Sequence, residues 1–76
     1  MEGRWPDEAR LIDWSNRGTV HGSRVTFGRS DAGLFLVSLK WSTVTLEPCE
    51  LTIRANSYHD VLARACTALV AAGEQL

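Results

Sequence analysis

The sequence predicts an α+β domain: an antiparallel sheet of three strands, or four, packed by a C-terminal helix, with a short helix at the N-terminus. Two periodic patterns support this fold class. In the middle of the chain apolar residues alternate with polar ones, as in a strand with one buried face. Near the C-terminus they recur at steps of three and four, as in a helix with one buried face. Because a chain of 76 residues has room for a single hydrophobic core, we expect one domain over residues 1–76.

The N-terminal segment is expected to form a short helix from residue 6 to about residue 16. Pro6 suits the first turn of a helix, and Asp7 and Glu8 suit the positive end of the helix dipole. A strand through residues 11–14 is the alternative, because four residues do not settle the period. We prefer the helix.

The middle of the chain is expected to form a hairpin. Residues 34–41 alternate most regularly and are assigned to the central strand, and residues 24–27 show the same pattern more briefly. Residues 29–33 between them have the Ser, Asp and Gly content of a turn.

A third strand is expected within residues 46–54, where Pro48 places its start at a sheet edge or a bulge. Whether residues 43–46 add a fourth short strand stays open. The residues expected to face the core are Val25, Phe27, Phe35, Val37, Leu39, Trp41, Leu51 and Ile53.

The C-terminal helix is expected to span residues 57–72. Ser57 can cap its first turn, Asp60 suits its positive end, and Gly73 suits its end. Its buried face is expected to contain Leu62, Ala65, Cys66 and Leu69.

Neither a metal site nor a catalytic site is expected. Structural zinc sites use ligands paired two to four residues apart, and no such pair occurs among the potential ligands. Residues 57–60 contain serine, histidine and aspartate, but consecutive residues at a helix start point in different directions and do not form a triad. The sequence therefore predicts a protein that is not an enzyme and has no cofactor. The potential metal ligands considered were His21, Cys49, His59 and Cys66.

The two cysteines are expected to be buried thiols, because Cys49 and Cys66 are too few and too far apart for a disulfide framework. A single bridge between strand and helix is the alternative in an oxidising compartment. No apolar run approaches the length of roughly 20 residues that a membrane span needs, and the first 14 residues are rich in acids. We therefore expect a cytoplasmic protein with no membrane partner.

Basic residues are concentrated in one part of the chain, although the formal net charge is −1. Between residues 14 and 46, Asp31 is the acid that opposes four cations, which are Arg17, Arg24, Arg29 and Lys40. This stretch could bind phosphate groups, and a solvated hairpin face is the alternative interpretation.

Several short phrases resemble a known family. Residues 11–18 (LIDWSNRG) are similar to the end of its first helix, and residues 35–39 (FLVSL), after the loop at residues 30–33, are similar to its second strand. Asn56-Ser57 before an alanine-rich helix is similar to its last element. Together with the order helix, three strands, helix, these phrases resemble the double-stranded RNA-binding domain.

The residues by which that family holds RNA are not matched. The resemblance implies phosphate-binding lysines at the start of the second helix, where this chain has Tyr58, His59 and Leu62. The family's loop histidine has no counterpart in residues 30–33. The sheet followed by a serine-capped helix also resembles small antitoxins of the HicB type, which implies a protein partner.

The leading hypothesis is a non-enzymatic binding module that acts through a protein–protein surface, as inhibitors, antitoxins and phage or mobile-element regulators do. Trp5, Trp41 and Tyr58 are the candidate contact residues, because aromatic residues dominate interface energetics. Binding of structured RNA or DNA is the alternative function. Self-association into a homodimer also stays open, because an exposed strand edge can pair across a two-fold axis. The candidate residues for nucleic acid are Arg17, Arg24, Arg29 and Lys40.

Overall fold

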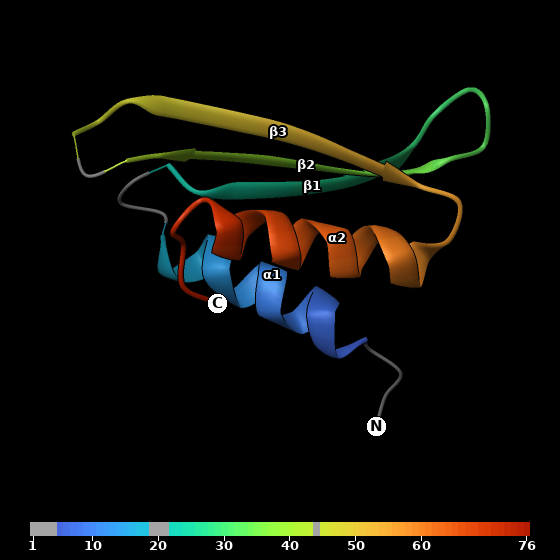
Figure 1. Cartoon of the computed structure of the whole chain (residues 1–76), viewed down its shortest axis with the longest axis horizontal. Helices are drawn as coiled ribbons and strands as arrows, with labels where there is room; N and C mark the ends of the chain where they lie inside the picture. Colours follow the sequence, from blue (N-terminus) through green and yellow to red (C-terminus); the bar gives the residue numbers. More distant parts are fainter. Residues whose placement is uncertain (1–4, 19–21, 44) are drawn as a thin grey trace.

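The computed structural model describes residues 5–18, 22–43 and 45–76. Its elements follow the order α-β-β-β-α (Figure 1), which confirms the α+β fold class. The elements are α1 (Pro6–Arg17), β1 (Arg24–Arg29), β2 (Phe35–Ser42), β3 (Pro48–Ala55) and α2 (Tyr58–Ala71).

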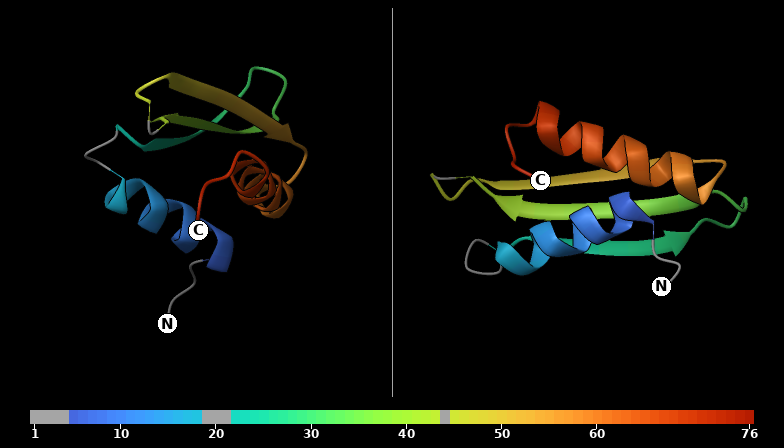
Figure 2. Two further views of the ribbon diagram at one scale, coloured as in Figure 1. Left: turned by 60° about the vertical axis from the view of Figure 1, so that its left-hand side comes forward. Right: turned by 90° about the horizontal axis from the view of Figure 1, so that it is seen from below.

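The three strands form one open antiparallel sheet in the order β1-β2-β3, so β2 is the central strand as predicted. Both helices lie on the same face of the sheet (Figure 2), where α1 contacts β1 and α2 contacts β2 and β3. The opposite face is covered by neither helix. We call these the core face and the outer face of the sheet.

The N-terminal segment is a helix, which settles the choice between helix and strand. Pro6 and Asp7 both lie in the first turn. Proline is favourable there because the N–H that it lacks would have no partner within the helix, and the Asp7 carboxylate is favourable because it faces the positive end of the helix dipole. Leu11 and Trp14 are three residues apart and both buried, which requires the helical period. The helix ends at Gly18, whose backbone N–H donates to the Trp14 carbonyl at 3.0 Å.

The C-terminal helix begins and ends within one residue of the predicted bounds. The Ser57 hydroxyl accepts a hydrogen bond from the Asp60 backbone N–H at 3.0 Å, which satisfies one of the unpaired donors of the first turn. Gly73 follows the helix with a φ of 90°, a conformation that glycine adopts at little cost. Val61 is also fully buried, although the expected buried face did not include it.

The two hairpin turns are tight. In the first, the Gly33 N–H donates to the Ser30 carbonyl at 3.0 Å, as the glycine in this turn predicts. In the second, the Thr43 N–H donates to the Glu47 carbonyl at 3.0 Å and Leu46 has a φ of 64°. Where the structure describes them, residues 43–46 therefore form a turn and not a fourth strand; residue 44 lies outside the described residues.

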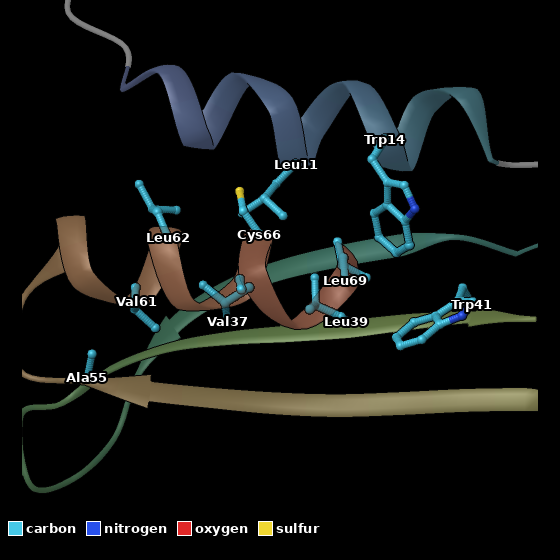
Figure 3. Packing of buried hydrophobic residues seen from close by; sticks show 11 residues of the cluster. Leu11, Trp14, Val37, Leu39, Trp41, Ala55, Val61, Leu62, Cys66 and Leu69 are labelled. Carbon is cyan, nitrogen blue, oxygen red and sulfur yellow. The ribbon is translucent and has the colours of Figure 1, made fainter. Parts of the chain in front are cut away.

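One hydrophobic cluster fills the space between the helices and the sheet (Figure 3). Leu62 and Cys66 of α2 point toward Leu11 of α1, whereas Val37 and Leu39 of β2 lie beneath α2. Four of the residues predicted to face the core are only partly buried, at the margin of the cluster: Val25, Phe27, Phe35 and Ile53. The buried members are Leu11, Trp14, Val37, Leu39, Trp41, Ala55, Val61, Leu62, Ala65, Cys66 and Leu69.

Three expectations about burial are corrected. Trp41 is not an exposed contact residue: it is 6% exposed and packs edge-to-face on Trp14, with ring centroids 6.0 Å apart. Leu51 points to the core face but is 36% exposed, because β3 is an edge strand with a neighbour on one side alone. Cys49, at the start of the same strand, is partly exposed, whereas Cys66 is buried.

The two thiols are therefore expected to react at different rates. Burial raises the pKa of the Cys66 thiol, the Asp7 carboxylate raises it further, and Arg10 opposes both effects. Because the thiolate is the reactive form, a disulfide reagent at pH 8 should label Cys49 quickly and Cys66 slowly in the folded protein. Loss of the fast phase in Cys49→Ala checks the assignment, and equally rapid labelling of that variant would contradict it.

The same shift has a consequence for stability at alkaline pH. A thiol whose pKa is raised by folding stabilises the native state at pH values below the ordinary pKa of a thiol, near 9.0. This contribution is lost as the pH rises through the pKa that the thiol has in the folded protein. The free energy of unfolding should therefore fall more steeply between pH 8 and pH 10 in the wild type than in Cys66→Ala. Parallel curves for the two proteins would contradict the expectation.

Candidate functional site

The starts of the two helices form an exposed aromatic site. Both helices begin at the same end of the molecule (Figures 1 and 2). Trp5 immediately precedes α1 and is 46% exposed, and His59 lies in the first turn of α2. The two rings meet in a tilted contact with centroids 5.5 Å apart. An exposed tryptophan is thus held against a second ring at the point where both helices begin.

Tyr58 extends this site toward the sheet. Its hydroxyl is 2.6 Å from Oε1 of Glu8, so it joins the first turn of α2 to the first turn of α1. Its ring lies 5.7 Å from that of Phe35 and 6.3 Å from that of Phe27. The guanidinium of Arg29 lies over the Phe35 ring, 4.5 Å from its centroid.

We call this group the aromatic end. Its members come from the segment before α1, from both strands of the first hairpin and from α2. The arrangement combines exposed or half-buried rings with an arginine, the residue types that contribute most to protein interfaces. The aromatic end consists of Trp5, Phe27, Arg29, Phe35, Tyr58 and His59.

The structure brings together two of the three predicted protein-binding residues, Trp5 and Tyr58. It places Trp41 in the core. Phe27 and Phe35 were expected to face the core, and His59 was considered only as a potential metal ligand and as the residue at a lysine position of the resembled family. Their joint placement depends on how the helix starts meet the hairpin, which no local pattern indicates.

The four predicted nucleic-acid-binding residues do not share one face. Arg24 and Lys40 lie opposite each other on the outer face, and Lys40 forms an ion pair of 3.5 Å with Glu50. Arg29 is five residues further along β1 and faces the other way, because side chains alternate along a strand. Arg17 is at the end of α1, where its Nε atom forms an ion pair of 2.8 Å with Asp13, one turn earlier in the helix.

Residues 57–60 act as a helix cap. The Ser57 hydroxyl accepts from the Asp60 N–H, and His59 Nδ1 lies 3.9 Å from Asp60 Oδ1. In the described residues, no three His, Cys, Asp or Glu side chains lie close enough to hold a metal ion. His21, one of the potential ligands in the sequence, lies outside them. Neither α1 nor α2 has the length and apolar character needed to cross a membrane.

A pocket of about 240 Å³ lies at the opposite end of α1, where the chain after α2 returns. The indole N–H of Trp14 donates to Glu74 Oε1 at 3.0 Å, and Arg17 donates to the Gln75 carbonyl at 3.4 Å. These bonds hold the C-terminal segment on α1. They engage polar atoms of four of the residues that line the pocket, which are Trp14, Arg17, Glu74 and Gln75.

Comparison of the chain with family models, with curated proteins and with solved structures gives no match. The resemblance to the double-stranded RNA-binding domain therefore stays a prediction. At the positions of that family's phosphate-binding lysines, Leu62 is fully buried and Tyr58 packs on Phe35, so these two side chains face the core and the aromatic end.

Proposed function

We propose that this domain is a non-enzymatic protein-binding module whose contact surface is the aromatic end. One observation supports this most directly: Trp5 is 46% exposed, whereas Trp14 and Trp41 are both buried in the core. A tryptophan left in water exposes a large apolar area that a partner can bury. Its contact with His59 limits its rotation, so less side-chain entropy is lost on binding.

The surroundings of Trp5 support a partner surface with a basic rim. Acidic side chains lie in the first turns of both helices, Asp7 in α1 and Asp60 in α2. A complementary surface offers an apolar pocket for the indole with lysine or arginine at its rim. A protein surface of this kind suits an inhibitor, an antitoxin or a regulator that acts by occupying its partner.

Trp5→Ala tests the proposal. We expect the variant to remain folded and to bind its partner about 30-fold more weakly, which corresponds to a loss of about 2 kcal/mol for an anchoring tryptophan. The wild type, Trp5→Ala and Val70→Ala are immobilised in parallel, and the proteins retained from a lysate of the source cells are identified. The candidate partner is then purified and its affinity measured by calorimetry. Val70 is the matched control, because it is 57% exposed but lies away from the aromatic end, late in α2.

Equal partner affinity for the wild type and Trp5→Ala would exclude the aromatic end as the contact surface. A titration with a labelled RNA duplex at two salt concentrations tests the alternative function. Tight binding that weakens steeply with salt would favour nucleic acid over a protein partner.

A further inference from the structure

The free edge of β3 offers a second surface, separate from the aromatic end. In the described part of the chain, β3 pairs with β2 on one side and has no strand on the other, so a row of backbone N–H and C=O groups faces outward. α1 packs against β1 at the other edge of the sheet. β3 also exposes Leu51 at 36%, although this side chain is on the core face. The β3 edge therefore combines free hydrogen-bonding groups with apolar surface.

The sequence of β3 is complementary to itself in the antiparallel direction. If a second copy paired with β3 around a two-fold axis at Thr52, Glu50 would lie opposite Arg54 of that copy, and Arg54 opposite its Glu50. In the same register Leu51 would lie opposite Ile53 of the second copy, and Ile53 opposite its Leu51. Each pair is of a kind that stabilises adjacent strands.

The two sets of pairs lie on different faces of the sheet. Glu50 and Arg54 are on the outer face, as shown by their register with Lys40 and Leu36 of β2. Leu51 and Ile53 pair with Leu39 and Val37 and are on the core face. The charged pairs would therefore form in solvent, and the apolar pairs would extend the core.

Other registers lose this complementarity. Moving the axis to Glu50 places two carboxylates opposite each other, and moving it to Arg54 places two guanidinium groups together, both of which are unfavourable. An axis at Leu51 or Ile53 leaves threonine opposite one charge. Arg54 has no ion pair with any residue that the structure describes, and the second copy would supply one.

We infer that two copies of this chain associate through β3 in this register and form one six-stranded antiparallel sheet. The two-fold axis stands perpendicular to the sheet, so the helices of both copies lie on one face. α2 contacts both β2 and β3, so the two α2 helices flank the row formed by Leu51 and Ile53 of both copies.

Charge reversal tests the dimer and its register together. Sedimentation equilibrium should show a dimer for the wild type, and Glu50→Arg and Arg54→Glu should each weaken dimerisation about tenfold or more, because each creates two like-charged contacts. An equimolar mixture of these two variants should recover the wild-type affinity, since the new charges pair between them. Arg24→Glu, on the outer face of β1, is the control and should dimerise like the wild type. A wild-type chain that stays monomeric up to about 1 mM, or a mixture no tighter than its components, overturns the inference.

Cross-linking checks the position of the axis. In a Cys49→Ala background, Thr52→Cys should form an intermolecular disulfide on mild oxidation, because directly opposite residues lie within the Cα separation that a disulfide spans. Glu50→Cys should not, since its two copies are offset by four residues, roughly 13 Å. Equal cross-linking of both variants contradicts this register. Trp5→Ala should dimerise like the wild type, so the dimer and the aromatic end are tested independently.

Discussion

Leu69→Ala should lower the free energy of unfolding by about 2 to 5 kcal/mol, the range measured for buried leucines. Leu69 is 0% exposed and lies on the buried face of α2 within the hydrophobic cluster. The stability of a native domain is only about 5 to 15 kcal/mol, so a loss of this size removes a large share of it. Urea denaturation followed by circular dichroism measures the change.

Val70→Ala is the control for that experiment, because the neighbouring residue is largely exposed and its truncation should cost much less. The same denaturation midpoint for Leu69→Ala and Val70→Ala would contradict the burial of Leu69 between α2 and the sheet.

Gly18→Ala should lower the free energy of unfolding by about 1 to 3 kcal/mol, the usual cost of overpacking. A Cβ atom at Gly18 would lie 2.2 Å from Oγ and 2.6 Å from Cβ of Ser23, so one of the two segments must move. Movement is costly because Ser23 is buried, its N–H donates to the Gly18 carbonyl at 2.9 Å, and its own carbonyl accepts from Ser15. Thermal denaturation of the variant checks the prediction.

Two comparisons separate steric conflict from the general effect of replacing glycine. Among the residues that the structure describes, a Cβ atom at Gly28 meets no atom within 4 Å, so Gly28→Ala should be close to neutral. Adding Ser23→Gly to Gly18→Ala removes the clashing atoms and should recover part of the lost stability. Equal destabilisation by Gly18→Ala and Gly28→Ala would show that the contact with Ser23 is not the cause.

The elements that the sequence predicted best are those whose local patterns are strong. α2 has a serine cap, a helical period and a terminal glycine, and its bounds differ from the prediction by one residue at each end. β2 is the central strand as expected, and its burial alternates because successive side chains point to opposite faces of a sheet that the helices cover on one side. Local pattern and tertiary environment agree in both elements.

The predictions that failed concern tertiary position. Leu51 lies at a core-facing position in the alternating pattern of β3. How far its side chain is buried, however, depends on whether the strand lies at the edge or in the middle of the sheet. Trp41 satisfied two interpretations, as core residue and as exposed contact, and its contact with Trp14 of another element decided between them. The basic residues were grouped because they are close in sequence. In the structure Arg24 and Arg29 lie five residues apart on β1, and their side chains point to opposite faces of the sheet. Trp5 and Tyr58 were named as candidate contact residues from their residue type, but their neighbours in the aromatic end were not.

The hydrogen bond between Trp14 and Glu74 affects the order in which the chain can fold during synthesis. It joins residues 60 positions apart, whereas each strand of the sheet pairs with the next across a short turn. The entropy of closing a loop grows with its length, so the hairpins can close early and α1 docks late. α1 leaves the ribosome before every other element described. Trp14 can pack on Trp41 once β2 has followed, but Leu11 lacks Leu62 and Cys66 until α2 has emerged. Part of the apolar face of α1 is therefore exposed until the last element of the domain has emerged.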